Sequence, residues 1–462
     1  MGTNDALKRE AIAALQRGEL LAFGVSEKQH GSDLLASDFT LTQLPDDRYR
    51  ATGSKYYIGN SNVASIISVL AKKQGARATP HAHRAPFLLF ALRPRECKAT
   101  FVSRKIQTLG IRAAHVGEFS IKDHELPASD VVAQGRDAWD AVLGTVNLGK
   151  FFLGFGAIGI CEHAMEEAIA HLSSRILYGK PVNEMPHIRA LMTQAYARLI
   201  AMKLYAYRAL DYVASASESD RRYLLYCAIQ KAKVSTEGVK VMSLLSECIN
   251  AKGFESDTYC EMALRDIQLF PGLESSTHIN LALTAQFIPQ YFSSNHATIS
   301  SPVHISESNT LSAENPYLMR ARSSGINTVH FAPYLAAYQP LIHIANVRLF
   351  ARQAQRFASF LDSSQGQALS NGPTDVTIEI AKCAAIITYA QLIAERSLRI
   401  APPLTAVIFA QLIADLTAAV LALASSSHIG FRGRLLLRRA MAIPQTAEPD
   451  LRDIAVQMTA LR

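Results

Sequence analysis

The chain has 462 residues, which is too long for one compact core and typical of about three domains. Hydrophobic residues make up 49% and charged residues 19%, proportions that indicate a folded protein and exclude a disordered one. The net charge of +8 comes from scattered lysines and arginines without a basic run interleaved with aromatics, so we expect no nucleic acid as a partner.

Residues 1–19 are charged and amphipathic, unlike a signal peptide, and predict a short helix. The six cysteines lie far apart without a Cys-x-x-Cys pair. This spacing argues against a zinc site or a disulfide framework, so we predict no metal and a reducing compartment, the cytoplasm.

Residues 20–134 predict a compact β domain, a barrel or a sandwich, because short apolar or alternating runs are separated by turn signals. The clearest strand signals are at 48–60, 64–73, 85–93 and 117–126.

The first strand of this domain, "LLAFGVS", leads into a polar loop that contains Gly31-Ser32-Asp33. Such a loop offers a tight turn, a hydroxyl group and free N–H groups that suit a phosphate or a carbonyl. An ordinary β-turn is the alternative. The chain contains no P-loop, no His-Glu-x-x-His, no Gly-x-Ser-x-Gly and no Gly-x-Gly-x-x-Gly opening a Rossmann unit.

Residues 135–290 change to helical spacing and predict an antiparallel helical bundle. A Ser/Asn/Pro-rich stretch, 291–325, predicts a linker. Residues 326–462 predict an additional C-terminal helical domain.

Two segments of the C-terminal domain each have two interpretations. The apolar run 404–424 is long enough to cross a bilayer, but Gln411 and Asp415 at its centre favour a buried bundle helix. Membrane association is thus possible but not favoured. The basic run from Arg432 to Arg439 is either a solvated helix face or a docking surface for an acidic partner or a membrane.

Five motifs occur in an order and spacing that resemble the acyl-CoA dehydrogenase and acyl-CoA oxidase family over roughly residues 3–290. They are "VSE…HGSD", "GSKYYIGN", "LGIRAAHVGEFSIKDHELPASDVV", "SSRILYGKPV" and "ALRDIQLF". The resemblance implies a multidomain α+β fold in which a β-barrel domain precedes an antiparallel helical bundle. FAD would lie between them and across a subunit interface, and an acyl thioester would be oxidised to its α,β-enoyl form.

The resemblance also assigns a catalytic base. In the family a glutamate follows an Arg-Asp helix end by a short turn, and here Arg265-Asp266 is followed by Glu274. Taken alone, a loop glutamate is usually solvated. As a base in an apolar pocket, Glu274 would have a raised pKa and would remove the α-proton while a hydride passes to the flavin N5. Leu273 and Ser32 would contact the substrate.

By the same resemblance, several residues would bind FAD, and most of them lie on the first strands. They are Phe23, Val25, Ser26, Ser32, Tyr57, Gly59, Arg175, Tyr178 and Gly253. Tyr57 replaces a common Trp, Gly59 a common Thr or Ser, and Ser275 the glycine after the base. Arg175 and Tyr178 match residues that reach the FAD of a neighbouring subunit.

The sequence departs from the family at a glycine-rich turn, where 247–254 keeps only Gly253, and at its start, where 1–19 resembles the tail of a longer helical domain. The C-terminal helices or a separate chain would complete the acyl pocket, or the sequence is truncated. These departures support an alternative, a non-catalytic structural or regulatory subunit of a hetero-oligomer.

The expected partners follow from the proposed chemistry and from the charge. They are an acyl-CoA or acyl-carrier-protein thioester, and an electron-transfer flavoprotein or O₂ as electron acceptor. A homo-oligomer, a dimer or tetramer, is expected as well.

Overall fold

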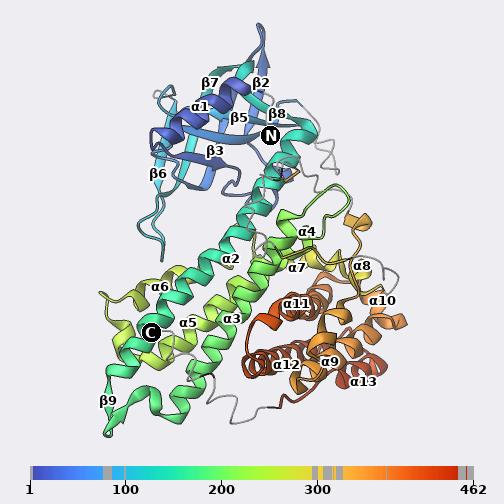
Figure 1. The fold of residues 1–462 in the computed structure, drawn as a ribbon. Coiled ribbons are helices and arrows are strands. Elements are labelled where there is room, and N and C mark those ends of the chain that lie inside the picture. The colour runs from blue at the N-terminus through green and yellow to red at the C-terminus, as the bar shows by residue number, and fades with distance from the viewer. Residues whose placement is uncertain are drawn as a thin grey trace. The chain divides into compact units, whose positions relative to one another are not determined.

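The structure is a computed structural model that describes residues 4–75, 86–97, 100–293, 300–304, 315, 317–318, 326–370, 372–445 and 454 (Figure 1). It divides into two compact units: Met1–Val146 with Pro316–Ser323, and Asn147–Asn315 with Ser324–Arg462. Most of the predicted linker and the end of the predicted C-terminal domain lie outside the described residues.

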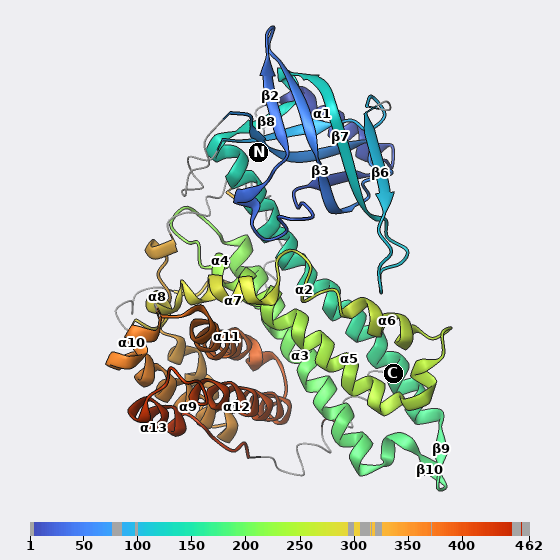
Figure 2. The same ribbon diagram turned by 180° about the vertical axis from the view of Figure 1, so that it is seen from behind.

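The first unit contains one mixed sheet of eight strands in the order β6-β7-β3-β2-β4-β5-β8, with β1 beside β4 (Figure 2). Strand β4 pairs in parallel with β1 and β2, and the other pairs are antiparallel. The strands are β1 (Leu21–Gly24), β2 (Thr40–Leu44), β3 (Arg48–Gly59), β4 (Ile66–Lys73), β5 (Phe87–Leu92), β6 (Phe101–Lys105), β7 (Val116–Pro127) and β8 (Val131–Gln134).

The sheet does not close in the described part of the chain, so the predicted barrel is not confirmed, although the strands predicted at 48–60, 64–73, 85–93 and 117–126 all form. Strand β6 at one end is short and largely exposed, as edge strands are. At the other end, β5 and its neighbours are covered by the first turns of a helix, where Trp139 stacks on Phe87 with ring centroids 5.0 Å apart.

Alternating side chains build the core of the first unit. Tyr49, Ala51 and Ile58 of β3 point inward with residues of β4, β5 and β7, as a half-buried sheet requires. The helix predicted within 1–19 is α1 (Asp5–Gln16). It begins at Asn4, whose side chain accepts hydrogen bonds from two backbone N–H groups, and it is held to the sheet by a two-point ion pair between Glu10 and Arg93.

The second unit is helical, and α2 enters it from the first. The helices are α2 (Gly135–Ser174), α3 (Pro186–Ala214), α4 (Tyr223–Ile229), α5 (Ser235–Ile249), α6 (Tyr259–Ile267), α7 (Thr277–Ala285), α8 (Ile288–Phe292), α9 (Ala345–Leu361), α10 (Ser364–Ser370), α11 (Thr374–Arg396), α12 (Pro402–Ala424) and α13 (Phe431–Arg439). A glycine, Gly238, allows α5 to pack closely on Ala157 of α2 and Met202 of α3.

Two helical stretches are interrupted. One π-helical turn, Gln230–Val234, lies between α4 and α5. Before α9 the chain forms a 3₁₀ helix, Tyr334–Leu341, in which Pro340 has no N–H to donate.

The C-terminal helices pack on the bundle within the second unit, where α11 contacts α3 and α7, and α12 contacts α3, α9 and α13 (Figures 1 and 2). Three helices in the described residues are long and apolar enough to cross a membrane, namely α2, α12 and the stretch Thr374–Arg399 that contains α11. The two polar side chains at the centre of α12 form a hydrogen bond or ion pairs with other groups of the protein. Gln411 donates to the carbonyl of Gln194, and Asp415 forms ion pairs with α3 and α5 side chains and with Lys233.

Candidate active site

Glu274 lies in the loop between α6 and α7, and the second end of this loop is fixed by a side-chain cap. The Ser276 side chain accepts a hydrogen bond from the Ile279 N–H at the start of α7. Just before it, Glu274 and Ser275 both have positive φ, +51° and +79°. The backbone at Ser275 therefore adopts the left-handed conformation that the family's glycine favours, at a cost of roughly 1–2 kcal/mol for serine. Such strain is typical of functional sites.

The Glu274 side chain lies against the backbone of α2 at Gly149. A Cβ at this glycine would come within 3.3 Å of the Glu274 Cδ, so a larger residue would displace the carboxyl group. Burial raises the pKa of Glu274, and the charges of Lys150 and Lys231 partly oppose that rise. Glu274 is therefore half-buried rather than fully solvated, as a loop glutamate taken alone would be.

Two buried lysines accompany this carboxyl group, and sequence analysis did not identify either. Burial lowers the pKa of Lys150 on α2, and the charge of Glu274 opposes the decrease. Lys231 lies in the π-helical turn and donates to the carbonyl of Phe270. Burial lowers its pKa to about 8, the charge of Lys150 adds to the decrease, and Glu274 opposes it. A π-helical turn often marks a functional position.

In the first unit, the predicted flavin-contacting strand is tied to β3. The Ser26 hydroxyl donates to the carbonyl of Tyr56 (2.6 Å), and the Tyr56 N–H donates to the carbonyl of Ser26 (2.9 Å). Lys55 donates to the carbonyl of Val25 (2.9 Å). Phe23, on β1, packs with Val25 in a hydrophobic cluster. These predicted residues therefore form one rigid stretch.

A buried ion pair lies directly beneath this stretch. The Lys55 ammonium is 2.7 Å from the Glu27 carboxylate, which also accepts hydrogen bonds from the Ser37 hydroxyl and from the N–H groups of Asp38 and Phe39. Burial lowers the pKa of Lys55 to about 8, although Glu27 opposes the decrease. Sequence alternation did contain a signal, because Lys55 shares the inward parity of Tyr49.

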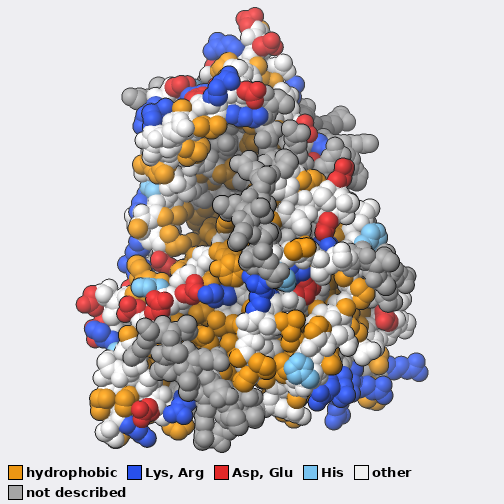
Figure 3. All heavy atoms as spheres, viewed as in Figure 1, with side chains coloured by type: hydrophobic (Ala, Val, Ile, Leu, Met, Phe, Trp, Pro, Cys, Tyr) orange, Lys and Arg blue, Asp and Glu red, His pale blue; other side chains and the backbone are white. Residues whose placement is uncertain are grey.

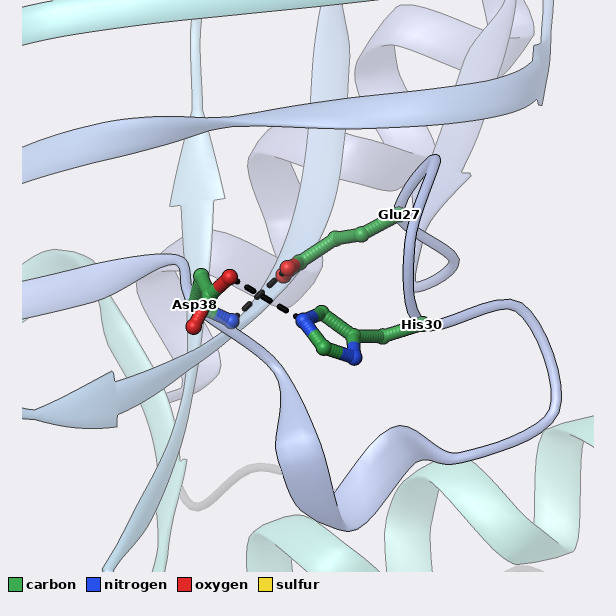
Figure 4. Close-up of side chains that lie close together, drawn as sticks. All are labelled: Glu27, His30 and Asp38. Carbon is green, nitrogen blue, oxygen red and sulfur yellow. Dashed lines mark hydrogen bonds and ion pairs between the residues drawn. The ribbon is translucent and has the colours of Figure 1, made fainter.

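The loop after β1 brings together three side chains with metal-ligand atoms, Glu27, His30 and Asp38, within 4.8 Å of one another (Figure 4). The His30 ring contacts the Asp38 carboxylate at 3.0 Å, and Glu27 points to the backbone nitrogen of Asp38. Both oxygens of Glu27 already accept hydrogen bonds, and Lys55 supplies its counter-charge. We therefore assign this group no metal.

Tyr57 and Gly59 lie at a β-bulge of β3, where the pairing with β7 shifts between Lys55 and Ile58. Tyr57 has φ +61° and its residue is 64% exposed, and Gly59 is exposed at the end of the strand. Bulges commonly re-aim a side chain next to a binding site. Ser32, the remaining predicted residue of this unit, lies in an exposed loop.

Arg175 and Tyr178 lie at a small exposed hairpin of the second unit, formed by β9 (Ile176–Leu177) and β10 (Lys180–Pro181). Tyr178 occupies its turn with φ +53° and is 95% exposed. Leu273, the predicted substrate contact, is half-buried beside Glu274. The second unit thus brings Leu273 to Glu274 and places the hairpin residues on its surface.

The altered glycine turn forms a 3₁₀ helix, Asn250–Phe254, after α5. Gly253 is buried there, and a Cβ would lie 3.1 Å from the Cys260 sulfur, so a larger residue would have to shift the Cys260 side chain. Asn250 has φ +61° and ψ −138°, a conformation that is nearly restricted to glycine. The backbone thus keeps a glycine-type conformation although the residue has changed.

We expect Asn250→Gly to raise the free energy of unfolding by about 1 kcal/mol, because relief of the backbone strain exceeds the extra entropy of glycine in the unfolded chain. Urea unfolding followed by circular dichroism measures the change. Asn147→Gly, within α2, is the matched control and should instead lower stability by a few tenths of a kcal/mol. Equal destabilisation by both substitutions would contradict the strain.

Comparison with known proteins matches two family models. "Acyl-CoA dehydrogenase, middle domain" matches residues 22–124, and "Acyl-CoA dehydrogenase, C-terminal domain" matches residues 137–288, together more than half of the chain. Isovaleryl-CoA dehydrogenase of Pongo abelii is 23% identical over 271 residues, which are 58% of this chain and 61% of that protein. The chain therefore spans about three fifths of that relative's length.

Two solved structures resemble the fold. An acyl-CoA dehydrogenase complexed with FAD from Bacillus anthracis has a TM-score of 0.75 at 18% identity. The match covers 100% of this chain and 79% of the Bacillus anthracis chain. Butyryl-CoA dehydrogenase from Megasphaera elsdenii has a TM-score of 0.53 at 22% identity, covering 62% of this chain and 73% of its own. The first likeness shows that the C-terminal helices also belong to a known arrangement.

Proposed function

The chain belongs to the acyl-CoA dehydrogenase family, and from that premise we propose that it is an FAD-dependent oxidoreductase that introduces a Cα–Cβ double bond into an acyl thioester, with Glu274 as the α-proton base. The observation that carries the proposal is the position of Glu274. Its half-buried carboxyl group lies in a strained loop between two helices, beside two buried lysines.

This environment suits a base. Removal of the weakly acidic proton α to a thioester requires a carboxylate that is ionised yet basic. Burial makes the Glu274 carboxylate more basic, and Lys150 and Lys231 stabilise its ionised form. Gly149 leaves the space that the carboxyl group needs. The proton passes from the substrate Cα to a Glu274 oxygen as the double bond forms.

FAD, when bound, supplies the acceptor for the hydride that leaves Cβ. Residues of this chain that fit the cofactor are Phe23, Val25 and Ser26 on the strand fixed to β3, and Tyr57, which the bulge holds outward. Asn250, which keeps a glycine-type backbone at the altered turn, supports the same conclusion. The Ser26 hydroxyl hydrogen is used by Tyr56, so Ser26 would act as an acceptor.

We propose further that Arg175 and Tyr178 contribute to the FAD site of another copy in a homo-oligomer. Their exposure on a hairpin supports this, since a flat exposed aromatic is suited to contact a second chain. The substrate carrier, CoA or an acyl-carrier protein, the electron acceptor, an electron-transfer flavoprotein or O₂, and a cytoplasmic location belong to the same proposal. Ser32 and Leu273 would contact the substrate.

Absorbance of the purified full-length protein, before and after addition of FAD, tests the proposal together with an assay of acyl-CoA oxidation using an artificial electron acceptor. A yellow protein that oxidises a thioester supports it. A colourless protein that takes up no added FAD would instead support the alternative, a non-catalytic subunit, which the mostly lost glycines of 247–254 favour.

The charge of Lys150 leads to a prediction for the pH dependence of the reaction. Since this charge lowers the pKa of Glu274, Lys150→Met should raise that pKa and move the acidic limb of the kcat/KM profile to higher pH. Lys203→Met, a partly exposed lysine of α3 paired with Glu162, is the control and should leave the limb in place. An unchanged limb in Lys150→Met would contradict the coupling.

A further inference from the structure

Two adjacent helices of the C-terminal region carry a surface that contains arginine and no acidic residue. On α9, Arg348, Arg352 and Arg356 repeat every four residues, so they share one face, and all three are exposed. On α13, four more arginines are exposed: Arg432, Arg434, Arg438 and Arg439. We call these seven residues the arginine surface.

The two helices hold the arginine surface rigidly. Helix α13 packs on α9 and α12 and buries Gly433 and Leu437. The guanidinium group of Arg356 donates to the carbonyl of Arg439 at 2.8 Å, which joins the helices directly. The blue group at the lower right of Figure 3 lies over α13. The sequence Ala345–Leu361 and the sequence Phe431–Arg439 contain no Asp or Glu, and the first acid after α9 is Asp362.

Large apolar side chains accompany these cations. Phe431 is 83% exposed and Ile443 is 87% exposed, and Leu435 is nearly half exposed. All exposed positions of α13 hold arginine, Phe431 or Leu435. The neighbouring α12 adds an exposed strip at helical spacing that consists of Ala414, Ala418, Leu421 and Ala422.

A solvated helix face, the simpler interpretation of the basic run, does not explain this composition. Solvated faces usually mix charges of both signs, because like charges at neighbouring positions repel. Exposure of Phe431 and Leu435 to water is unfavourable, because both side chains are apolar. The single sign of charge and the exposed apolar side chains would both be favourable at a surface where an anionic layer covers an apolar one.

We propose that the arginine surface binds the second unit to the surface of an anionic phospholipid bilayer. Guanidinium groups bind phosphate oxygens in pairs, while Phe431 and Leu435 enter the boundary between headgroups and acyl chains. An acidic protein is the less suitable occupant, because protein interfaces also use neutral hydrogen-bonding side chains, and the exposed positions of α13 offer none.

This contact lies on the membrane and does not cross it. The Asp415 carboxylate at the centre of α12 is held inside the protein by Arg198 and Lys233, so α12 keeps its place in the bundle. The proposal does not depend on catalysis or on FAD.

Co-sedimentation of the full-length protein with vesicles tests the proposal. We expect binding to vesicles of phosphatidylcholine and phosphatidylglycerol at about two to one, little binding to phosphatidylcholine alone, and release at high salt. Each arginine near an anionic surface contributes roughly a five-fold factor. The variant R432Q/R434Q/R438Q/R439Q should therefore lower the partition coefficient of the protein between vesicles and water several hundred-fold, which is roughly a five-fold factor for each of four arginines.

Three further variants separate the causes. R9Q/R95Q/R112Q/K122Q removes four exposed cations of the first unit and should bind as the native protein does. R432K/R434K/R438K/R439K keeps the charge and should retain most of the binding, which also controls for folding. F431S/L435S should bind at least about ten-fold more weakly, because each side chain loses apolar area that the boundary would bury.

Each of three other results would overturn the proposal. They are equal binding to neutral vesicles, an equal loss in the first-unit control, or absence of vesicle binding while acyl-carrier protein, an acidic protein, binds through the same arginines.

Discussion

Glu274→Gln is expected to lower kcat for acyl-thioester oxidation by at least about a thousand-fold while FAD stays bound. The amide keeps the size of the side chain and its contact with Gly149, but it cannot accept the α-proton. The flavin spectrum should therefore be unchanged, and binding of the thioester should remain measurable by its perturbation of that spectrum. Stopped-flow reduction of the bound flavin measures the chemical step directly.

Glu167→Gln is the matched control, since it removes a carboxylate from an exposed position of α2 and should leave kcat unchanged. Glu274→Asp should retain part of the rate because a shorter carboxylate still accepts a proton. Preserved turnover in Glu274→Gln would show that another group is the base and would leave the FAD proposal standing. Loss of flavin from this variant would show instead that the substitution disturbs the fold.

The resemblance to the family predicted Glu274, because it follows Arg265-Asp266 as the family's base does, but the sequence contained less information about what surrounds the carboxyl group. Lys150 and Lys231 are separated from Glu274 by more than a hundred and by about forty positions. Only the packing of α2, the π-helical turn and the α6–α7 loop brings them together. The left-handed backbone of Ser275 is likewise a property of the folded loop.

The fold shows the same division between local and distant information. Alternating residues predicted β3 to within a residue, because the period of two is a local property. Whether β6 and β8 meet depends on contacts between distant segments, and the expected closed barrel was not confirmed. Lys55 was overlooked because a charged residue at an inward position is normally excluded from a core unless a partner such as Glu27 is present.

The C-terminal helices pose the question of how a charge is tolerated in the middle of an apolar helix. Asp415 of α12 lies 3.1 Å from both Arg198 and Lys233, and Glu237 of α5 pairs with the same two cations at 2.5 and 2.8 Å. Lys240, partly exposed, contacts both carboxylates. Three cations and two carboxylates therefore hold α12, α3, α5 and the π-helical turn together.

Asp415→Asn is expected to lower the free energy of unfolding by about 3–5 kcal/mol, because it leaves Arg198 and Lys233 buried with Glu237 as the remaining strong counter-charge. The melting temperature should fall by about 10 °C. Asp375→Asn, which changes an exposed aspartate of α11, is the control and should leave the melting temperature nearly unchanged. A loss no larger than that of the control would mean that the ion pairs do not fix α12 to the bundle.

The same cluster predicts how stability depends on pH. Lys233 and Arg198 hold the pKa of Asp415 well below its usual range despite burial, and they lower the pKa of Glu237 to about 2 despite burial. Both folded-state values lie below the unfolded values near 4. The stabilisation is therefore complete above about pH 5 and is lost as the pH falls toward 2. Asp415→Asn should flatten this acid limb of the stability curve, because the protein then has one fewer carboxylate to protonate on unfolding.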